Sequence, residues 1–247
     1  MQITDSFEKV FGNKQKILVV MGHPDDLEVM TGGTVARLIS EGKQVRSVKL
    51  TMGDKGSQQE EITQKELSEI RLREDTNSMH SLGIKDEDNI YLGVEDGSVE
   101  NNIETIKKIA EQIRLFKPDI IITHNPEDII IRFSKDINWV NHRDHRNTAK
   151  STIDAAYPYS RDTLFFPEQL QNGAKSHICT EFLLVDYYDH PDLVEIDVTS
   201  FIDTRIKAHA NHKSQYTLKH AQESADFFTK SEGTSKRYER FRYVIAD

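Results

Sequence analysis

Cysteine is almost absent: Cys179 is the single thiol in 247 residues. One thiol excludes an intramolecular disulfide and a zinc site built from several cysteines. Long apolar runs are absent too. Ile17 to Met21 is among the longest, whereas a membrane-spanning helix needs about 18–20 apolar residues. These absences predict a protein without a membrane span that works in a reducing compartment, the cytoplasm.

An excess of positive charge is also missing. The sequence has 32 Lys plus Arg against 41 Asp plus Glu, a formal net charge of -9. Nucleic-acid-binding proteins normally present a basic face, so we expect no nucleic-acid partner. The first eight residues carry neither the basic start nor the apolar run of a secretion signal, which predicts no export. Linker-like and repeated segments are absent, so we predict a single domain over residues 1–247.

The sequence does contain short apolar runs that alternate with amphipathic segments. Lys16 to Gly22 predicts a strand buried on both faces, and the residues after Gly32-Gly33 have helical spacing up to Gly42. A second strand over Gln44 to Leu50 completes a βαβ unit, which gives parallel strands. The alternation continues with helices over 60–82 and from 103, and strands at 89–92 and 119–124. The expected fold class is α/β, a Rossmann-like, mostly parallel sheet with flanking helices.

The C-terminal third predicts a small strand pair and further helices. Glu181 to Tyr188 and Leu193 to Val198 read as a strand pair, with His190-Pro191-Asp192 as its turn. Arg132 to Asn141 has weak periodicity and predicts a loop, followed by a helix from about His142. Further helices are expected around Ser200 to His212 and Thr217 to Phe228.

The densest polar cluster, His23-Pro24-Asp25-Asp26-Leu27-Glu28, follows the first predicted strand. Ligands bind beyond the carboxyl ends of strands in parallel sheets, so this position favours a site. His23 and Asp26 are three residues apart, and a tight turn would bring the imidazole and the carboxylate onto one metal ion. The alternative is a simple turn, because Pro and Asp are ordinary turn residues and Asp caps helices.

A second cluster, Asn141-His142-Arg143-Asp144-His145, opens another predicted helix. Alone it reads equally as a charged helix start, where Asp144 is favourable. Together the clusters offer His23, Asp26 and His145 as a two-histidine, one-aspartate site, the pattern of a catalytic zinc. The same donors suit a non-haem Fe(II) oxygenase, but such an enzyme gives no role to Asp25.

These motifs resemble those of the PIG-L or LmbE-like family of zinc-dependent N-acetylglucosaminyl deacetylases. The resemblance rests chiefly on the His-Pro-Asp-Asp segment from His23 and on His142-Arg143-Asp144-His145. Arg143 stands where the family usually has Pro. Weaker agreement comes from five further segments, Gly32-Gly33-Thr34, Arg71 with Glu74, Lys117-Pro118-Asp119, His212-Lys213-Ser214-Gln215 and Tyr238-Glu239-Arg240-Phe241.

The resemblance implies a Zn²⁺ ion, with Fe²⁺ as the alternative metal, held by His23, Asp26 and His145. It implies that Asp25 is the general base. The expected reaction is hydrolysis of the N-acetyl group of an N-acetylglucosamine-type conjugate, with release of acetate. The implied partner is a small amino-sugar molecule, and a homo-oligomer is compatible with the sequence.

The resemblance also implies that His142, oriented by Asp144, stabilises the oxyanion, and that Arg71 and His212 contact the substrate. A catalytically inactive sugar-binding protein of the same fold is the non-enzyme alternative. The intact set of histidines and aspartates argues against it.

Three other residues have ordinary interpretations. His124 follows the strand before the second cluster, and we interpret it as a strand-end histidine with its hydrogen bonds satisfied. Trp139 is expected to pack in the core or to stack on a sugar ring. Cys179 has no activating neighbour and is expected to be buried and apolar. Gly32-Gly33 matches no nucleotide-binding pattern.

Overall fold

The structure is a computed structural model that describes residues 4–58 and 60–246. Over these residues, seven strands form one sheet in the order β3-β2-β1-β4-β7-β9-β8. The first five strands of this order run parallel, and β9 is antiparallel to both β7 and β8. The predicted fold class is therefore confirmed. The strands are β1 Lys16–Met21, β2 Gln44–Lys49, β3 Asn89–Tyr91, β4 Ile120–Thr123, β7 Glu181–Leu184, β8 Leu193–Asp197 and β9 Tyr238–Ile245.

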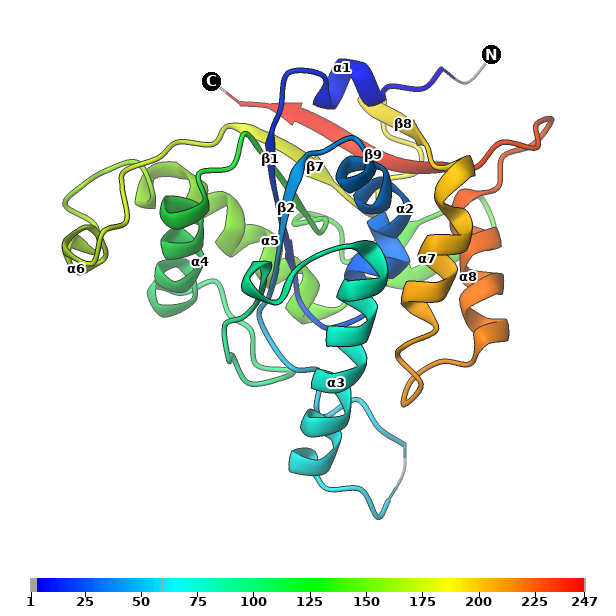
Figure 1. Cartoon of the computed structure of the whole chain (residues 1–247), viewed down its shortest axis with the longest axis horizontal. Helices are drawn as coiled ribbons and strands as arrows, with labels where there is room; N and C mark the ends of the chain where they lie inside the picture. The colour runs from blue at the N-terminus through cyan, green and yellow to red at the C-terminus, as the bar shows by residue number, and fades with distance from the viewer. Residues whose placement is uncertain (1–3, 59, 247) are drawn as a thin grey trace.

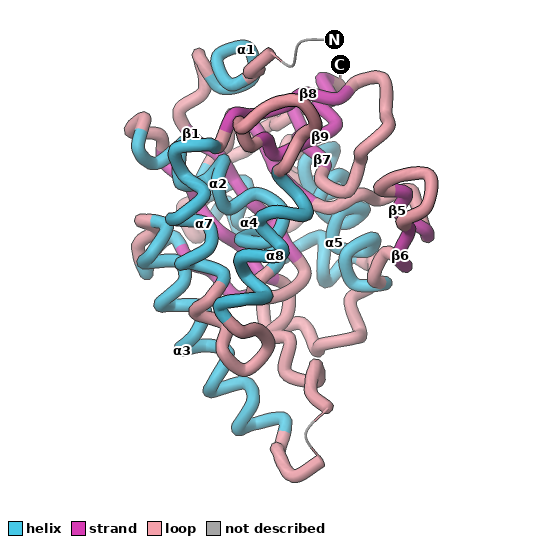
Figure 2. The backbone as a smooth tube through the Cα atoms, turned by 90° about the vertical axis from the view of Figure 1, so that its right-hand side faces the viewer, coloured by secondary structure: helices cyan, strands magenta, loops and turns pink. Residues whose placement is uncertain are grey.

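Helices cover both faces of the sheet, with α2, α3, α7 and α8 on one face and α4 and α5 on the other (Figures 1 and 2). Within the described residues, no helix is long and apolar enough to cross a membrane. The helices are α1 Phe7–Phe11, α2 Asp26–Ser40, α3 Gln64–Leu82, α4 Ile103–Phe116, α5 Arg143–Asp154, α6 Pro167–Gln171, α7 Ile202–His209 and α8 Leu218–Thr229, with short helical segments η1 Asp86–Asp88, η2 Ala155–Tyr159 and η3 Thr199–Phe201.

The first strand is buried on both faces, as predicted. Ile17, Val19 and Met21 of β1 enter the core beneath α2, and Leu18 and Val20 enter the core beneath α4. Side chains of a strand point alternately to opposite faces, so an unbroken apolar run is what a central strand between two helical layers needs. β1 is therefore an interior strand of the sheet, between β2 and β4.

Local sequence sets the ends of the long helices. Thr63 and Glu66 form a reciprocal capping box, so α3 begins at Gln64 and not at the expected residue 60. Gly83 ends α3 in the left-handed conformation that glycine adopts without strain. Asn102 caps α4 by accepting the Thr105 N–H. These caps therefore set where α3 begins and ends and where α4 begins.

Two sequence expectations are wrong. The segments 181–188 and 193–198 are not a paired hairpin, because β9 lies between β7 and β8 and pairs with both. Their common pairing partner, β9, comes from the distant C-terminal end of the chain. Turn residues near β7 and β8 cannot predict a partner so far away in sequence. The expected loop over 132–141 contains strand β6 (Asn138–Val140), which pairs with β5 (Ile130–Arg132). Strands of three residues are too short to show an alternation in sequence.

Helix α2 begins earlier than expected and runs through Gly32 and Gly33. At this point two buried side chains bond to the helix backbone. Glu239 of β9 accepts the N–H groups of Gly33 and Thr34 at 2.9 and 2.7 Å. Arg205 of α7 donates to the Val29 carbonyl at 2.6 Å and lies 3.3 Å from Glu239. The two side chains thereby tie α2 to β9 and α7.

Close packing explains one of these glycines. A Cβ on Gly33 would lie 2.7 Å from the Cβ of Val198, a distance that side-chain atoms do not tolerate. The absence of a side chain therefore lets α2 approach the segment before α7 and lets the carboxylate of Glu239 reach the helix backbone.

Glu239→Ala should destabilise the protein by about 3–5 kcal/mol, because it leaves the buried Arg205 guanidinium without its carboxylate partner. Glu239→Gln, which keeps an acceptor oxygen, should cost less. Urea unfolding followed by circular dichroism measures both. The exposed Glu232 provides the control, and Glu232→Ala should change the free energy of unfolding by less than about 0.5 kcal/mol. Equal effects at the two positions would contradict this account of α2.

Candidate active site

The two predicted motifs meet at the carboxyl edge of the sheet. The His23–Asp26 segment leaves the end of β1, and α5, which carries His145, follows the hairpin after β4. β1 and β4 are neighbours in the sheet. Adjacent parallel strands open onto the same edge, where ligands of α/β proteins bind. Residues about 120 positions apart in sequence therefore share one site.

Three predicted ligands converge on one point. His23 Nδ1 lies 3.4 Å from Asp26 Oδ2, His145 Nε2 lies 3.1 Å from Asp26 Oδ1, and the two ring nitrogens are 3.2 Å apart. Tetrahedral zinc with ligands at 2.0–2.1 Å places neighbouring donor atoms about 3.3 Å apart. The donor types and their spacing therefore fit a divalent metal ion.

The far side of the His23 ring contacts two carboxylates. Its Nε2 lies 3.1 Å from Asp96 Oδ1 and 3.5 Å from Asp144 Oδ2. Burial opposes ionisation of Asp96, but the contact with His23 lowers the pKa of Asp96 to about 2. A carboxylate behind a histidine orients the ring and strengthens it as a metal ligand. Asp96 was not singled out from the sequence, although it follows β3 at the same sheet edge.

His124 is part of the cluster, and the expectation that its hydrogen bonds are satisfied is wrong for Nδ1, which is buried without a hydrogen-bond partner among the described residues. Its Nε2 accepts the Gly22 N–H at 3.0 Å and lies 3.3 Å from Asp26 Oδ2. Its ring stacks on that of His145, with centroids 4.0 Å apart and planes at 3°. Burial is the main cause that lowers the pKa of His124, to about 4. A neutral His124 therefore supports the ring of His145. In the sequence, the place of His124 directly after a buried strand was the feature that could have assigned it to the site.

Asp25 has its own surroundings, separate from those of Asp26. Its backbone has a φ of 98°, a conformation that costs energy outside glycine and often marks functional positions. Arg71 Nη2 donates to Asp25 Oδ2 at 2.9 Å and to the Pro24 carbonyl at 2.6 Å. Burial raises the pKa of Asp25, and Arg71 opposes that shift. The charge of Asp25 in turn raises the pKa of Tyr216.

His142 lies at the exposed side of the cluster, with its ring centroid 5.0 Å from that of His23. Its Nδ1 accepts the backbone N–H of Asp144 at 3.2 Å. The Asp144 carboxylate points elsewhere, accepting the N–H groups of Gly97 and Val99 at 2.7 and 3.3 Å. The expected orientation of His142 by Asp144 thus involves the Asp144 backbone, whereas its carboxylate faces His23. Burial and the charge of His23 lower the pKa of His142.

The residues expected to contact substrate are engaged within the protein. Arg71 is buried and also donates to the Gly53 carbonyl at 2.6 Å. His212 is wholly buried, and its Nε2 lies 2.8 Å from Glu28 Oε1, which also accepts from Ser78. Burial disfavours the charge of Glu28, yet His212 lowers the pKa of Glu28 to about 2. A substrate contact by either residue remains a prediction, and both hold other site segments in place.

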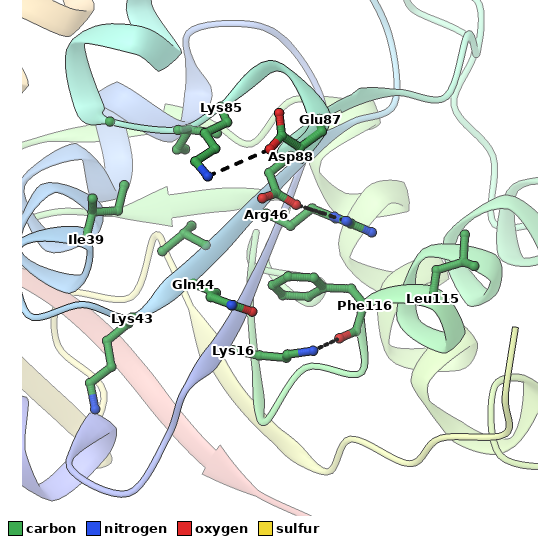
Figure 3. A pocket seen from close by; sticks show the side chains of 13 residues that line it. Lys16, Ile39, Lys43, Gln44, Arg46, Lys85, Glu87, Asp88, Leu115 and Phe116 are labelled. Atoms are coloured by element: carbon green, nitrogen blue, oxygen red, sulfur yellow. Dashed lines mark hydrogen bonds and ion pairs between the residues drawn. The ribbon is translucent and has the colours of Figure 1, made fainter.

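A basic cavity of about 490 Å³ lies at the opposite edge of the sheet, by the amino ends of β1 and β2 (Figure 3). Its cations are already partnered. Lys16 donates to the Phe116 carbonyl, Arg46 pairs with Asp88 at 2.9 Å, and Lys43 donates to three backbone carbonyls. Basic side chains that donate hydrogen bonds to the last carbonyl groups of a helix stabilise that helix. The basic residues of this cavity therefore serve to stabilise the fold. The cavity is separate from the polar cluster, which lies at the other edge of the sheet.

Two residues outside the cluster match their sequence interpretations. Trp139 is half-buried and packs edge-on against Tyr188 and Phe228, with ring centroids 5.7 and 6.0 Å apart. Its aromatic neighbours favour the packing role. Cys179 is buried, and burial raises the pKa of its thiol to about 12. A thiol that stays protonated is a poor nucleophile.

His212→Gln should lower the free energy of unfolding of the metal-free protein by about 3 kcal/mol, most strongly between about pH 4.5 and 6.5. The lowered pKa of Glu28 gives stability that is complete above its ordinary 4.5 and is lost as the pH falls towards 2. The raised pKa of His212 gives stability that is complete below its ordinary 6.5 and is lost as the pH rises through the folded value.

Urea unfolding at pH 3, 5.5 and 9 in a chelator measures this window. The exposed His220 provides the matched control, and His220→Gln should be neutral at each pH. A loss for His212→Gln that does not change with pH would show that the pair is not ionic.

Comparisons with known proteins identify a matching family and similar proteins. The model of the PIG-L family, described as GlcNAc-PI de-N-acetylase, matches residues 18–156. A diacetylchitobiose deacetylase of Thermococcus kodakarensis is 27% identical over 83% of this chain and 72% of its own length. A mycothiol S-conjugate amidase of Streptomyces coelicolor is 27% identical over 62% of this chain and 55% of its own.

Solved structures show the same architecture. The N,N'-diacetylchitobiose deacetylase of Pyrococcus horikoshii, in complex with its inhibitor MPG, aligns with a TM-score of 0.81 at 25% identity, covering 97% of this chain and 87% of that one. GalB, a 4-carboxy-2-hydroxymuconate hydratase of Pseudomonas putida, aligns with a TM-score of 0.74 at 17% identity, covering 94% of this chain and 97% of that one. The GalB likeness shows the fold alone, so the reaction must be argued from the site residues.

Proposed function

Because this chain belongs to the PIG-L family, we propose that it hydrolyses the N-acetyl group of an N-acetylglucosamine-type conjugate and releases acetate. The family resemblance inferred from the motifs is confirmed. One observation carries the proposal: His23, Asp26 and His145 approach one another to 3.1–3.4 Å, with the two histidines on different oxygens of Asp26, beside a separate carboxylate, Asp25, that Arg71 holds. A metal site with a base next to it is one of the arrangements that hydrolyse amides, because the metal polarises the carbonyl and the base takes a proton from water.

In this proposal His23, Asp26 and His145 hold the metal, with zinc as the expected ion and Fe²⁺ as the alternative. When bound there, the metal supplies polarisation of the amide carbonyl and acidification of a water molecule. The support is the donor spacing, together with the Asp96, Asp144 and His124 contacts that orient the ligands. An Fe(II) oxygenase would use the same three donors but leaves the buried Asp25–Arg71 pair without a chemical role.

Asp25 acts as the general base. It accepts the proton of the water whose oxygen attacks the acetyl carbon, and it returns that proton to the sugar nitrogen as the C–N bond breaks. The products are acetate and a free amine. Arg71 fixes the carboxylate through Oδ2, and burial raises the pKa of Asp25 above that of an exposed carboxyl group. Both effects suit a group that takes and then gives a proton.

His142 donates a hydrogen bond to the oxyanion. Since its Nδ1 accepts the Asp144 N–H, the neutral ring carries its proton on Nε2. Burial and the charge of His23 lower the pKa of His142, which favours that neutral form. A donor aimed at the developing oxyanion typically lowers the barrier by a few kcal/mol.

The proposal also covers the substrate class, the extent of the domain and the cell compartment. The substrate is a small amino-sugar conjugate, in line with the sugar-directed deacetylases and the amidase that the chain resembles. The whole of residues 1–247 forms one catalytic domain. The single buried cysteine is consistent with a cytoplasmic protein, where thiols stay reduced.

Asp25→Ala should lower acetate release by about 10²–10⁴-fold and leave the zinc content near one equivalent. Asp26→Ala, the matched neighbour, should lose the metal as well as activity. Plasma emission spectroscopy gives the metal content, and a coupled acetate assay gives the rate. Loss of zinc from Asp25→Ala would mean that the roles of the two aspartates are misassigned.

His145→Ala should lose zinc, because only two donors then remain. His220→Ala changes an exposed histidine and should keep full occupancy and rate. Competition with a colorimetric zinc chelator measures both affinities. If His145→Ala retains full affinity, another residue completes the ligand set.

A further inference from the structure

An apolar patch is exposed where η2, the loop before α6 and the segment that leads into β7 meet. Its exposed side chains are Tyr157, Leu164, Phe165 and Ile178. Two hydrogen bonds between His177 and Ser160, at 3.1 and 2.9 Å, hold the segment before β7 alongside η2. The patch lies with α6 on the opposite side of the molecule from α7 and α8 (Figure 1). Exposed apolar patches of soluble proteins commonly mark contact sites.

Leu164 projects from a loop that is held rigidly from beneath. Arg114 of α4 is wholly buried under this loop. Its guanidinium donates at 2.8–3.3 Å to the backbone carbonyls of Tyr159, Ser160, Asp162, Phe165 and Phe166. A buried charge needs all these acceptors, so the arrangement holds residues 159–166 in one conformation. Leu164, which is 91% exposed, therefore costs little entropy to order on binding.

An apolar cavity of about 310 Å³ lies beside this loop, at the amino end of β7. Its apolar walls are Ile153, Tyr157, Ile178 and Phe182. Tyr157 and Ile178 thus belong both to the patch and to the cavity. A cavity at the small end of the range for ligand sites suits an aliphatic side chain inserted from outside.

The charge of the surrounding segment favours contact between like chains. Residues 157–180 contain two basic and two acidic side chains, whereas the whole chain has a net charge of -9. Arg161 donates to the adjacent Asp162 at 2.7 and 3.1 Å, and Lys107 pairs with Glu168 at 2.5 Å. This locally neutral surface offers no charge of one sign to a nucleic acid or to a strongly charged protein. It does let two acidic chains approach without local repulsion.

The projecting side chain and the cavity occur on the same face, as a twofold contact requires. In such a contact the same patch is used by both copies, so residue i meets residue j and residue j meets residue i. Leu164 of each copy can therefore enter the cavity of the other, and the two contacts form together.

We propose that this apolar patch joins two copies of the chain across a twofold axis, with Leu164 of each copy inserted into the cavity of the other. The inference does not depend on the proposed deacetylase activity and goes beyond it. The metal-type cluster stays open in such a pair, because it lies at the carboxyl edge of the sheet and the cavity lies at the amino end of β7.

Sedimentation equilibrium of the full-length protein at micromolar concentration measures the association. Wild type should have twice the 28.4 kDa of one chain, or a larger even multiple. Leu164→Asp should halve that mass, because it places a charge in each of two apolar contacts. The dissociation constant of the pair should rise by at least about 100-fold, tenfold or more for each contact. Ile178→Asp, which alters the cavity wall, should have the same effect.

Leu218→Asp is the matched control. Leu218 is 57% exposed and begins α8, where an acidic residue is favourable, so this variant should keep the wild-type mass. Circular dichroism should show that all three variants keep the wild-type fold. A wild-type mass of 28.4 kDa would overturn the proposal, as would a Leu164→Asp variant with the wild-type mass.

Mixing the two patch variants tests the insertion itself. Leu164→Asp keeps an intact cavity and Ile178→Asp keeps Leu164, so a mixed pair regains one of the two contacts. With one variant fluorescently labelled at its N-terminus, the mixture should associate at least about tenfold more tightly than either variant alone. If the mixture associates no better than its components, Leu164 does not enter the cavity of a second copy and the proposal fails.

Discussion

Three carboxylates in one helical turn are the constraint on which this structure depends. Asp25, Asp26 and Glu28 sit at the start of α2 and are all buried. Uncompensated buried charges are costly, and like charges add to the cost. The helix N-terminus offsets part of it, and the remainder requires cationic or hydrogen-bonding partners. Each carboxylate obtains its own: Asp25 has Arg71, Asp26 has the histidine cluster and Glu28 has His212.

Those partners come from different parts of the chain, so charge compensation also organises the fold. Arg71 is on α3, His145 is on α5, and His212 follows α7. The Glu239–Arg205 pair then fastens α2 to β9 and α7 further along the helix. Arg71, His212 and Glu239, which lie in the segments that agree more weakly with the family motifs, therefore anchor helix α2. The proposed division of labour between the adjacent aspartates follows from their separate partners.

The parts of the fold that local sequence controls were predictable. The burial of β1 and the end of α4 at Lys117-Pro118 follow from apolar spacing and from residues that cannot continue a helix. The false hairpin between β7 and β8 shows the limit, because β9 inserts from more than 40 residues away. His124 and Asp96 were missed for a similar reason. His124 directly follows β4 and Asp96 lies in the loop after β3, and only the tertiary structure brings them to Asp26 and His23.

The sequence by itself determined the family, the fold class and the residue types of the candidate site, because a single thiol left His and Asp as the metal donors and two motifs held them. Tertiary structure alone decided which atoms meet. In the folded protein the Asp144 carboxylate faces His23, and His212 is buried against Glu28. The physical reason is that hydrogen-bond geometry and desolvation depend on neighbours brought together by the sheet, and those neighbours are far apart along the chain.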